Sequence, residues 1–397
     1  MSTVANMKNK TETREGYKKT ELGWLPKEWA EINLGSLCQV TAGGTPSTTK
    51  AEYWGGHIPW MNSGEINLKQ IYDVAGRITK LGLDNSSTKL LPKNCVLIAL
   101  AGQGSTRGKV AINRIELCTN QSIAAYIVSS NNLDFEFLYH NLASRYNELR
   151  LISSGNETRG GLNLTILRSV KIYLPPLPEQ EKIAEILSCW DQAIETMEKL
   201  LAAKIRLKKT LTKKLLVPKP HWVEKMLGDV LDYEQPTKYQ VKEVEDFLKD
   251  KIPVLTANKS YIIGSTSDKE GIYKKGSCII FDDFTTDTKY VDFEFKIKSS
   301  AIKILTAKPG YNIKFIFELM QNINHPIGGH KRHYLSEFQY MTLILPELEV
   351  QDKIATIVSC FNHNINLYGQ NLELIKNQKK GLLQKLMNGS IRVKFKE

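Results

Sequence analysis

The chain has 397 residues, which predicts two to three domains at about 150 residues each. Hydrophobic residues make up 42% and charged residues 24%, a globular balance, and so long a chain can bury a core without disulfide or metal staples. No apolar run approaches the ~20 residues of a membrane-spanning helix, and the polar N-terminus lacks the apolar segment of a secretory signal, so we expect a cytoplasmic protein. The net charge of +12 predicts a polyanionic partner, first of all nucleic acid. A basic protein without such a partner is the alternative.

After a polar tail at residues 1–20, residues 21–173 predict a mixed α/β (α+β) domain. Residues 96–101 and 122–128 are short β-prone runs between turn residues, and residues 135–150 have a helical pattern. Three turn-rich, aromatic segments suit either a rigid corner of the core or a loop facing nucleic acid. They are Gly43-Gly-Thr-Pro46, Tyr53-Trp-Gly-Gly56 and Ile58-Pro-Trp60.

A glycine-rich loop, Gly102-Gln-Gly-Ser-Thr-Arg-Gly-Lys109, follows the first of these runs. It is not a phosphate-binding P-loop, because Gly-Lys comes one residue too late and Val110 stands where Ser or Thr is required. A dinucleotide fingerprint would need glycine where the chain has Arg107. We interpret the segment as a flexible basic loop that contacts DNA phosphates or base edges.

A long helix is predicted within residues 174–217, between Pro175, Pro176 and Pro178 at its start and Pro218 and Pro220 after its end. Its apolar residues recur at steps of four and three, which is a heptad seam. The seam positions are Ile183, Leu187, Trp190, Ile194, Met197, Leu201, Lys204, Lys208, Leu211 and Leu215.

Residues 218–345 predict a second mixed domain, with β-prone runs at residues 277–281 and 301–305 and a helix at residues 313–322. Its segment Phe281-Asp-Asp-Phe-Thr-Thr-Asp-Thr-Lys289 carries acids close to a lysine, a loose likeness to metal-dependent nucleases. Such triplets are common by chance, so we favour a turn or strand edge whose hydroxyl groups contact DNA.

The second half of the chain repeats the first. Residues 345–387 align without a gap with residues 174–216, and Trp222 with Leu227-Gly228 matches Trp29 with Leu34-Gly35. This is a duplication of a variable block followed by a similar helix. The second helix is expected within residues 346–390, before a tail at residues 391–397. Two helices with such seams are expected to pack on each other, and the alternative is that each is a core helix of its own domain.

The cysteine and histidine positions offer no catalytic or metal constellation. No two of Cys38, Cys95, Cys118, Cys189, Cys278 and Cys360 lie within five residues, which excludes Cys-x-x-Cys spacings and favours buried small hydrophobes. His325, His330 and His333 lack nearby cysteines, so no metal site is expected. The chain also lacks the Asn-Pro-Pro-aromatic motif of amino-methyltransferases and the Gly-x-Ser-x-Gly motif. These absences favour a non-catalytic binding and organising subunit.

With these motifs together, the chain resembles the specificity subunit of type I restriction–modification enzymes over nearly all residues beyond 20. The resemblance rests on the motifs of the first block, on the repeated Trp and Leu-Gly pattern and on the Leu-Pro and Gln-x-Lys-Ile-Ala helix starts. In the second block it rests on Ile252-Pro-Val-Leu-Thr-Ala-Asn258, Phe281-Asp-Asp-Phe-Thr-Thr286 and His330-Lys-Arg332. The second helix departs from the first at Glu349-Val350, where the first has Pro178-Glu179.

The resemblance implies two target recognition domains, each reading half of a bipartite DNA site, and an antiparallel, coiled-coil-like helix pair that separates them. It implies double-stranded DNA, two DNA adenine methyltransferase subunits and motor–nuclease restriction subunits as partners. S-adenosylmethionine, ATP and Mg²⁺ would then be bound by those partners and not by this chain.

For direct contacts to DNA we expect basic, hydroxyl and aromatic side chains of the two blocks, since arginine pairs with guanine and hydroxyl groups bond to bases or phosphates. The candidates are Ser105, Thr106, Arg107, Lys109, Arg159, Lys259, Tyr261, Thr285, Thr286, Lys289, Lys331 and Arg332. The threonines could instead reflect strand propensity. Two other functions stay open on the sequence: a stand-alone metal-dependent endonuclease using the acids near Asp283, and a purely structural coiled-coil scaffold.

Overall fold

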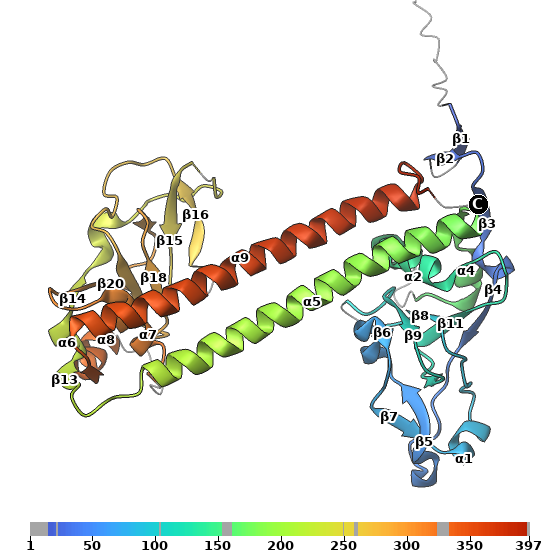
Figure 1. Ribbon diagram of the computed structural model, residues 1–397, viewed down its shortest axis with the longest axis horizontal. Helices are drawn as coiled ribbons and strands as arrows, with labels where there is room; N and C mark the ends of the chain where they lie inside the picture. The colour runs from blue at the N-terminus through green and yellow to red at the C-terminus, as the bar shows by residue number, and fades with distance from the viewer. Residues whose placement is uncertain are drawn as a thin grey trace, which may run out of the picture. The chain divides into compact units, whose positions relative to one another are not determined.

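The computed structural model describes residues 15–20, 23–102, 105–152, 161–248, 250–257, 261–323 and 333–394. Its described residues form two compact units. The first unit consists of the residues up to Thr196 together with those from Leu372 onward. The second unit consists of the residues from Met197 to Asn371. The boundaries fall inside the two long helices α5 (Leu177–Leu215) and α9 (Leu348–Met387), so each unit contains a stretch of both (Figure 1).

The first unit is built on a sheet with strand order β4-β11-β8-β9-β6. Every residue of β8 and β9 is buried, which is why these segments, apart from Asn113 at the end of β9, are continuously apolar rather than alternating. Smaller sheets have the orders β10-β5-β7, β12-β3 and β1-β2. The strands are β1 (Tyr17–Thr20), β2 (Gly23–Pro26), β3 (Ala30–Asn33), β4 (Cys38–Ala42), β5 (Trp54–Met61), β6 (Gln70–Ile71), β7 (Gly76–Ile78), β8 (Val96–Ala99), β9 (Val110–Asn113), β10 (Cys118–Thr119), β11 (Ile123–Val128) and β12 (Lys171–Leu174).

Short helices complete this unit, and the single helix expected at residues 135–150 is two helices that meet at Arg145. Arg145 ends α2 and its guanidinium donates to the Lys171 carbonyl oxygen at 2.6 Å, which fixes the break. The helices are α1 (Lys80–Asp84), α2 (Phe135–Ser144), α3 (Tyr146–Ile152) and α4 (Leu164–Ser169), with 3₁₀ turns η1 (Leu34–Ser36), η2 (Ala51–Tyr53) and η3 (Ser63–Leu68).

The glycine- and tryptophan-rich segments form a corner of the core. A Cβ on Gly43 would lie 2.2 Å from the carbonyl oxygen of Thr119, so only glycine fits there. The indole of Trp60 donates to the carbonyl oxygen of Gly44 at 3.0 Å and meets Trp54 edge to face, with ring centroids 5.0 Å apart. These contacts favour the first of the two interpretations of the segments.

The second unit repeats the strand order of three of these sheets, with one strand fewer in the central sheet and, among the described residues, no counterpart of the β1-β2 sheet. Its sheets are β14-β20-β17-β18, β16-β15-β19 and β13-β21. They correspond to β4-β11-β8-β9, β7-β5-β10 and β3-β12, down to the parallel pairing of β19 with β15 and of β10 with β5. The elements are β13 (Val223–Met226), α6 (Leu227–Val230), β14 (Leu231–Glu234), η4 (Pro236–Tyr239), β15 (Ile252–Leu255), β16 (Ile262–Thr266), β17 (Cys278–Asp282), β18 (Thr288–Val291), β19 (Lys296–Ile297), β20 (Ile302–Ala307), α7 (Ile313–Met320), α8 (His333–Ser336), η5 (Phe338–Tyr340) and β21 (Thr342–Leu345).

The two long helices pair along the predicted seam, which confirms the expected fold class. The lysines that interrupt the apolar seam find partners within each unit. In the first unit the Lys379 ammonium lies 2.5 Å from the Asp191 carboxylate. In the second, the Lys204 ammonium lies 4.7 Å from the ring centroid of Tyr368, and Lys208 lies 3.7 Å from Glu318. Among the helices of the described residues, none is long and apolar enough to span a membrane.

A buried glutamine fixes the start of each long helix. The amides of Gln180 and Gln351 donate at 2.8 Å to the carbonyl oxygen of the proline five residues earlier. Their side-chain oxygens accept from the backbone amides of Asp134 and Asn312, the residues that cap α2 and α7. Since buried polar groups must be bonded, glutamine at this place couples the helix start to the adjoining block in both units.

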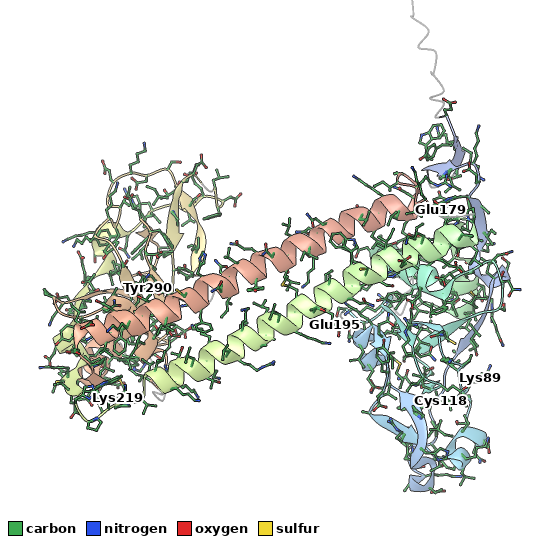
Figure 2. All side chains as sticks on the ribbon, in the orientation of Figure 1. Lys89, Cys118, Glu179, Glu195, Lys219 and Tyr290 are labelled. Atoms are coloured by element: carbon green, nitrogen blue, oxygen red, sulfur yellow. The ribbon has the colours of Figure 1, made fainter. Side chains whose placement is uncertain are left out.

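The difference between the copies at Glu179 and Val350 has a structural cause. The carboxylate of Glu179 is fully buried and accepts a hydrogen bond from the Trp29 indole at 3.0 Å. It also accepts two hydrogen bonds from the Arg392 guanidinium, at 2.7 and 2.9 Å. Figure 2 shows Glu179 at the beginning of α5, beside the end of α9. In the second unit Val350 packs on the apolar core instead, and the indole nitrogen of the matching Trp222 is buried without a hydrogen bond among the described residues.

We predict that Arg392→Ala destabilises the first unit by about 1–3 kcal/mol. The change leaves a buried carboxylate without its cation, and the loss falls short of that of a fully buried pair because the Arg392 side chain is 38% exposed. Urea unfolding followed by circular dichroism measures the change. Lys182→Ala, which removes an exposed pair with Glu185, is the control and should cost under ~0.5 kcal/mol. Equal losses for the two variants would contradict this assignment.

A second prediction concerns His140, which is buried in the first unit and bonds to the Ser188 hydroxyl at 3.1 Å. Burial and then the nearby Lys379 lower the pKa of His140 from 6.5 to about 4, against the opposing effect of Asp191. Because the unfolded chain binds the proton more tightly, the contribution of this neutral histidine to stability is complete above pH 6.5 and is lost as the pH falls towards 4. The loss over this interval is about 3 kcal/mol.

Unfolding of the wild type and of His140→Gln should therefore be compared at pH 7, 5.5 and 4.5. Glutamine does not titrate, so the difference in unfolding free energy between the two proteins should change with pH over this window. A difference that is constant with pH would show that His140 titrates equally in the folded and unfolded states.

Candidate nucleic-acid interface

The hairpin turn at the end of the central sheet is the same feature in both units. It joins β8 to β9 in the first unit and β17 to β18 in the second. The Leu100 amide donates to Ser122 at 2.8 Å, and the Asp283 amide donates to Ala301 at 2.9 Å. A residue near the start of the next helix then donates back to the turn. The amide of Leu162, two positions before α4, donates to the Leu100 carbonyl oxygen at 3.2 Å, and the amide of His333, the first residue of α8, donates to the Asp283 carbonyl oxygen at 3.1 Å. These matched bonds make the described residues of the first turn, 100–102 and 105–109, structurally equivalent to residues 283–287.

In the first unit the candidates Ser105, Thr106, Arg107 and Lys109 lie on this one turn. The Lys109 ammonium donates to Asn67 at 2.6 Å and to the Ser105 hydroxyl at 3.4 Å. Ser105 is exposed, whereas Thr106, Arg107 and Lys109 are half-buried. The described part of the turn therefore presents hydroxyl and cationic groups together.

Helix α3 supports this turn from outside it. The Tyr146 hydroxyl donates to the Ser105 carbonyl oxygen at 2.8 Å, and Arg150 donates to the Tyr146 oxygen at 2.7 Å. Gly108 has a φ of +82°, a left-handed conformation that glycine adopts without strain. A pocket of about 330 Å³ opens beside the turn, with Lys69 and Tyr139 in its wall. Asn67, Tyr146 and Arg150 could not be predicted as neighbours of the loop, because no sequence spacing connects them to it.

In the second unit the candidates Thr285 and Thr286 lie on the equivalent turn. The Asp282 carboxylate accepts from the Phe284 amide at 3.0 Å and from the Thr285 hydroxyl at 2.7 Å. Thr286 has a φ of +61°, a left-handed conformation that is strained for a β-branched residue. The Thr285 hydroxyl thus shapes the turn, while its exposed surface stays accessible.

The acids that suggested a nuclease are part of this scaffold. Asp283 is 1% exposed and lies 3.4 Å from the equally buried ammonium of Lys303, which also donates to Gln235 at 2.9 Å. The other Asp283 oxygen accepts from the Tyr334 amide at 2.8 Å. Within the described residues, no group of three or more His, Cys, Asp or Glu could hold a metal ion. The structure therefore uses Asp282 and Asp283 to build the turn.

The remaining candidates are separated from the turns or are not described. Lys289 is exposed on β18, the last described strand of its sheet. Tyr261 is half-buried against the core around β15, where burial and then the carboxylate of Asp292 raise the pKa of its hydroxyl. Asp292 follows the end of β18 that is remote from the turn, so the structure does not group Tyr261 with Thr285. Arg159, Lys259, Lys331 and Arg332 lie outside the described residues, as do His325 and His330.

Comparisons with known proteins agree with this architecture. The chain matches the family described as type I restriction modification DNA specificity domain over residues 26–204 and 220–377. It is 26% identical over 433 residues to the type I restriction enzyme MjaIX specificity subunit of Methanocaldococcus jannaschii, covering 95% of this chain and 96% of that one. A type I restriction enzyme specificity subunit of Escherichia coli is 38% identical over 148 residues, which are 34% of this chain and 37% of that one.

A solved structure shares the fold at low sequence identity. The S subunit of a type I restriction–modification system from M. genitalium matches with a TM-score of 0.63 and 17% identity, over 90% of this chain and 96% of that one. The duplicated blocks and the paired helices agree with the match to two copies of a DNA specificity domain. The chain belongs to the type I restriction–modification specificity subunit family.

We predict that Lys289→Ala weakens binding to all DNA sequences alike, because an exposed ammonium at a strand edge suits a phosphate contact. In the complex with its methyltransferase subunits, the slope of log affinity against log salt should become shallower by about 1. Lys353→Ala on α9, which removes a cation paired with Glu349, is the charge-matched control and should leave the slope unchanged. A loss confined to one base pair would instead make Lys289 a base-reading residue.

Proposed function

We propose that residues 21–173 and 218–345 are two target recognition domains, each of which reads one half of a bipartite DNA site. The observation that carries the proposal is the duplicated turn: equivalent loops at the ends of two equivalent sheets offer hydroxyl and cationic groups. The net charge of +12 supports a DNA partner. The helices at residues 174–217 and 346–390 then serve as the spacer, with tails at residues 1–20 and 391–397.

We further propose that the chemistry belongs to partner subunits in a cytoplasmic complex. Two methyltransferase subunits, one for each recognition domain, would carry S-adenosylmethionine and methylate adenine at N6. Motor–nuclease restriction subunits would bring ATP and Mg²⁺ for cleavage. The role of this chain is to choose the DNA sequence and to position those subunits on it.

A stand-alone endonuclease finds no support in the turn that suggested it. The carboxylate of Asp282 accepts hydrogen bonds from the Phe284 amide and the Thr285 hydroxyl, and Asp283 is buried beside Lys303. A metal-dependent nuclease needs carboxylates that are accessible to metal and DNA together. Of the acids in this segment, Asp287 alone is exposed.

The decisive test exchanges one block. Replacing residues 29–173 with the matching block of a relative should change one half of the methylated site and leave the other half intact, because each block has its own sheet and turn. Sequencing that detects N6-methyladenine across the genome, in cells with the native and the exchanged chain, measures both halves at once.

Two controls make this test specific. The purified chain without methyltransferase subunits should methylate and cleave nothing, and exchange of residues 222–344 should change the opposite half-site. A change of both halves by a single exchange would argue against independent reading. Sequence-specific cleavage by the chain alone would overturn the proposed function as a whole.

A further inference from the structure

The geometry of the second turn assigns a role to Phe284: we propose that its ring contacts the methyl group of a thymine in the second half-site. The inference rests on the proposed function and adds a specificity-determining residue to it. The sequence did not predict Phe284 as a DNA-contacting residue, because only its position in the folded turn distinguishes it from the other phenylalanine of this segment.

Phe284 is 45% exposed, whereas Phe281, three residues earlier, is fully buried against Tyr334 and Phe338. Within the described residues, no other aromatic ring contacts the ring of Phe284. Exposing a phenyl ring to water gives up hydrophobic stabilisation. Phe284 therefore contributes less to the core than Phe281 does, and part of its ring is accessible to a ligand.

The turn holds Phe284 in place before any ligand arrives. The backbone amide of Phe284 donates to the Asp282 carboxylate, whose other oxygen accepts from Thr285. The Thr286 amide donates to the Asp282 carbonyl oxygen at 2.9 Å, which closes the turn through the left-handed Thr286. Strained residues of this kind are concentrated at functional sites, and a preorganised side chain loses little entropy on binding.

The surroundings of Phe284 match a DNA groove rather than a protein partner. Lys289 is exposed on the strand that leaves the turn, and Thr285 is exposed next to the ring. An apolar ring on a turn that also carries an exposed cation and an exposed hydroxyl group fits a polyanion that also offers an apolar target.

In the major groove the apolar target is the C5 methyl group of thymine, and phenylalanine is one of the side chains that contact it. The equivalence of Leu100 with Asp283 places Ala101 where the second turn has Phe284. The ring is therefore particular to the second unit, and the contact is expected in that half-site alone.

The test uses the full chain in complex with its methyltransferase subunits and oligonucleotides in which each thymine of the site is replaced, one at a time, by deoxyuridine. This change removes only the methyl group. With the wild-type chain we expect one thymine of the second half-site at which the replacement lowers the methylation rate at subsaturating DNA by roughly threefold to tenfold. With Phe284→Ala, thymine and deoxyuridine at that position should give equal rates.

Phe284→Leu keeps an apolar contact and should retain part of the discrimination, while Tyr340→Ala, which removes an exposed ring from η5, should retain all of it. Wild-type rates that are insensitive to deoxyuridine at every position would overturn the proposal. So would a Phe284→Ala complex that methylates more slowly yet keeps the wild-type thymine preference, because the ring would then act only on the turn. Both results leave the proposed function standing, since that depends on sequence-specific methylation by the wild-type complex.

Discussion

The narrow apolar seam of the two long helices is the constraint on which the rest of the structure depends. One helix alone would expose this seam, and neither block is large enough to cover a helix of this length. Seam residues such as Ile194 and Leu372 are buried although most of their neighbours on the same helices are exposed. Because α5 and α9 must pair to bury this seam, the chain turns back after α5 before it forms α9. Each of the duplicated blocks adjoins the start of one of the two helices.

The start of each helix shows how a duplicated sequence can diverge without losing the fold. Gln180 and Gln351 keep the same bonds, because replacing either would leave buried backbone groups unpaired. Glu179 and Val350 have diverged, because only the first unit has Arg392 to neutralise a buried carboxylate. A buried charge is tolerated where its counter-charge is supplied, and an apolar residue takes its place elsewhere.

Much of the architecture could be predicted from the sequence because it depends on periodicity. The seam predicted both long helices, and the β-prone runs around Val96 and Ile279 became the central strands β8 and β17. The break at Arg145 could not be predicted, because it depends on a carbonyl group that only the fold brings near. The residue composition of the two turns predicted them as candidate DNA contacts, but it did not predict the residues that hold the turns in place. Tyr146 bonds to Ser105 and Tyr334 bonds to Asp283 across long sequence separations. Phe284 differs from a core phenylalanine only in its exposure, which the sequence does not encode locally.

The attachment of the C-terminal segment to the first unit has a consequence for synthesis. The Tyr17 hydroxyl bonds to the Gly389 carbonyl oxygen across 372 residues of chain, and Leu386 and Met387 belong to the same core as Trp29. The first block is therefore synthesised well before the residues of α9 that complete its core. During that interval its apolar surface is open to solvent, and a chain that stops before α9 is completed would leave the ribosome with a permanently unfinished first unit. Translation through α9 is thus a condition for completing the core of the first unit.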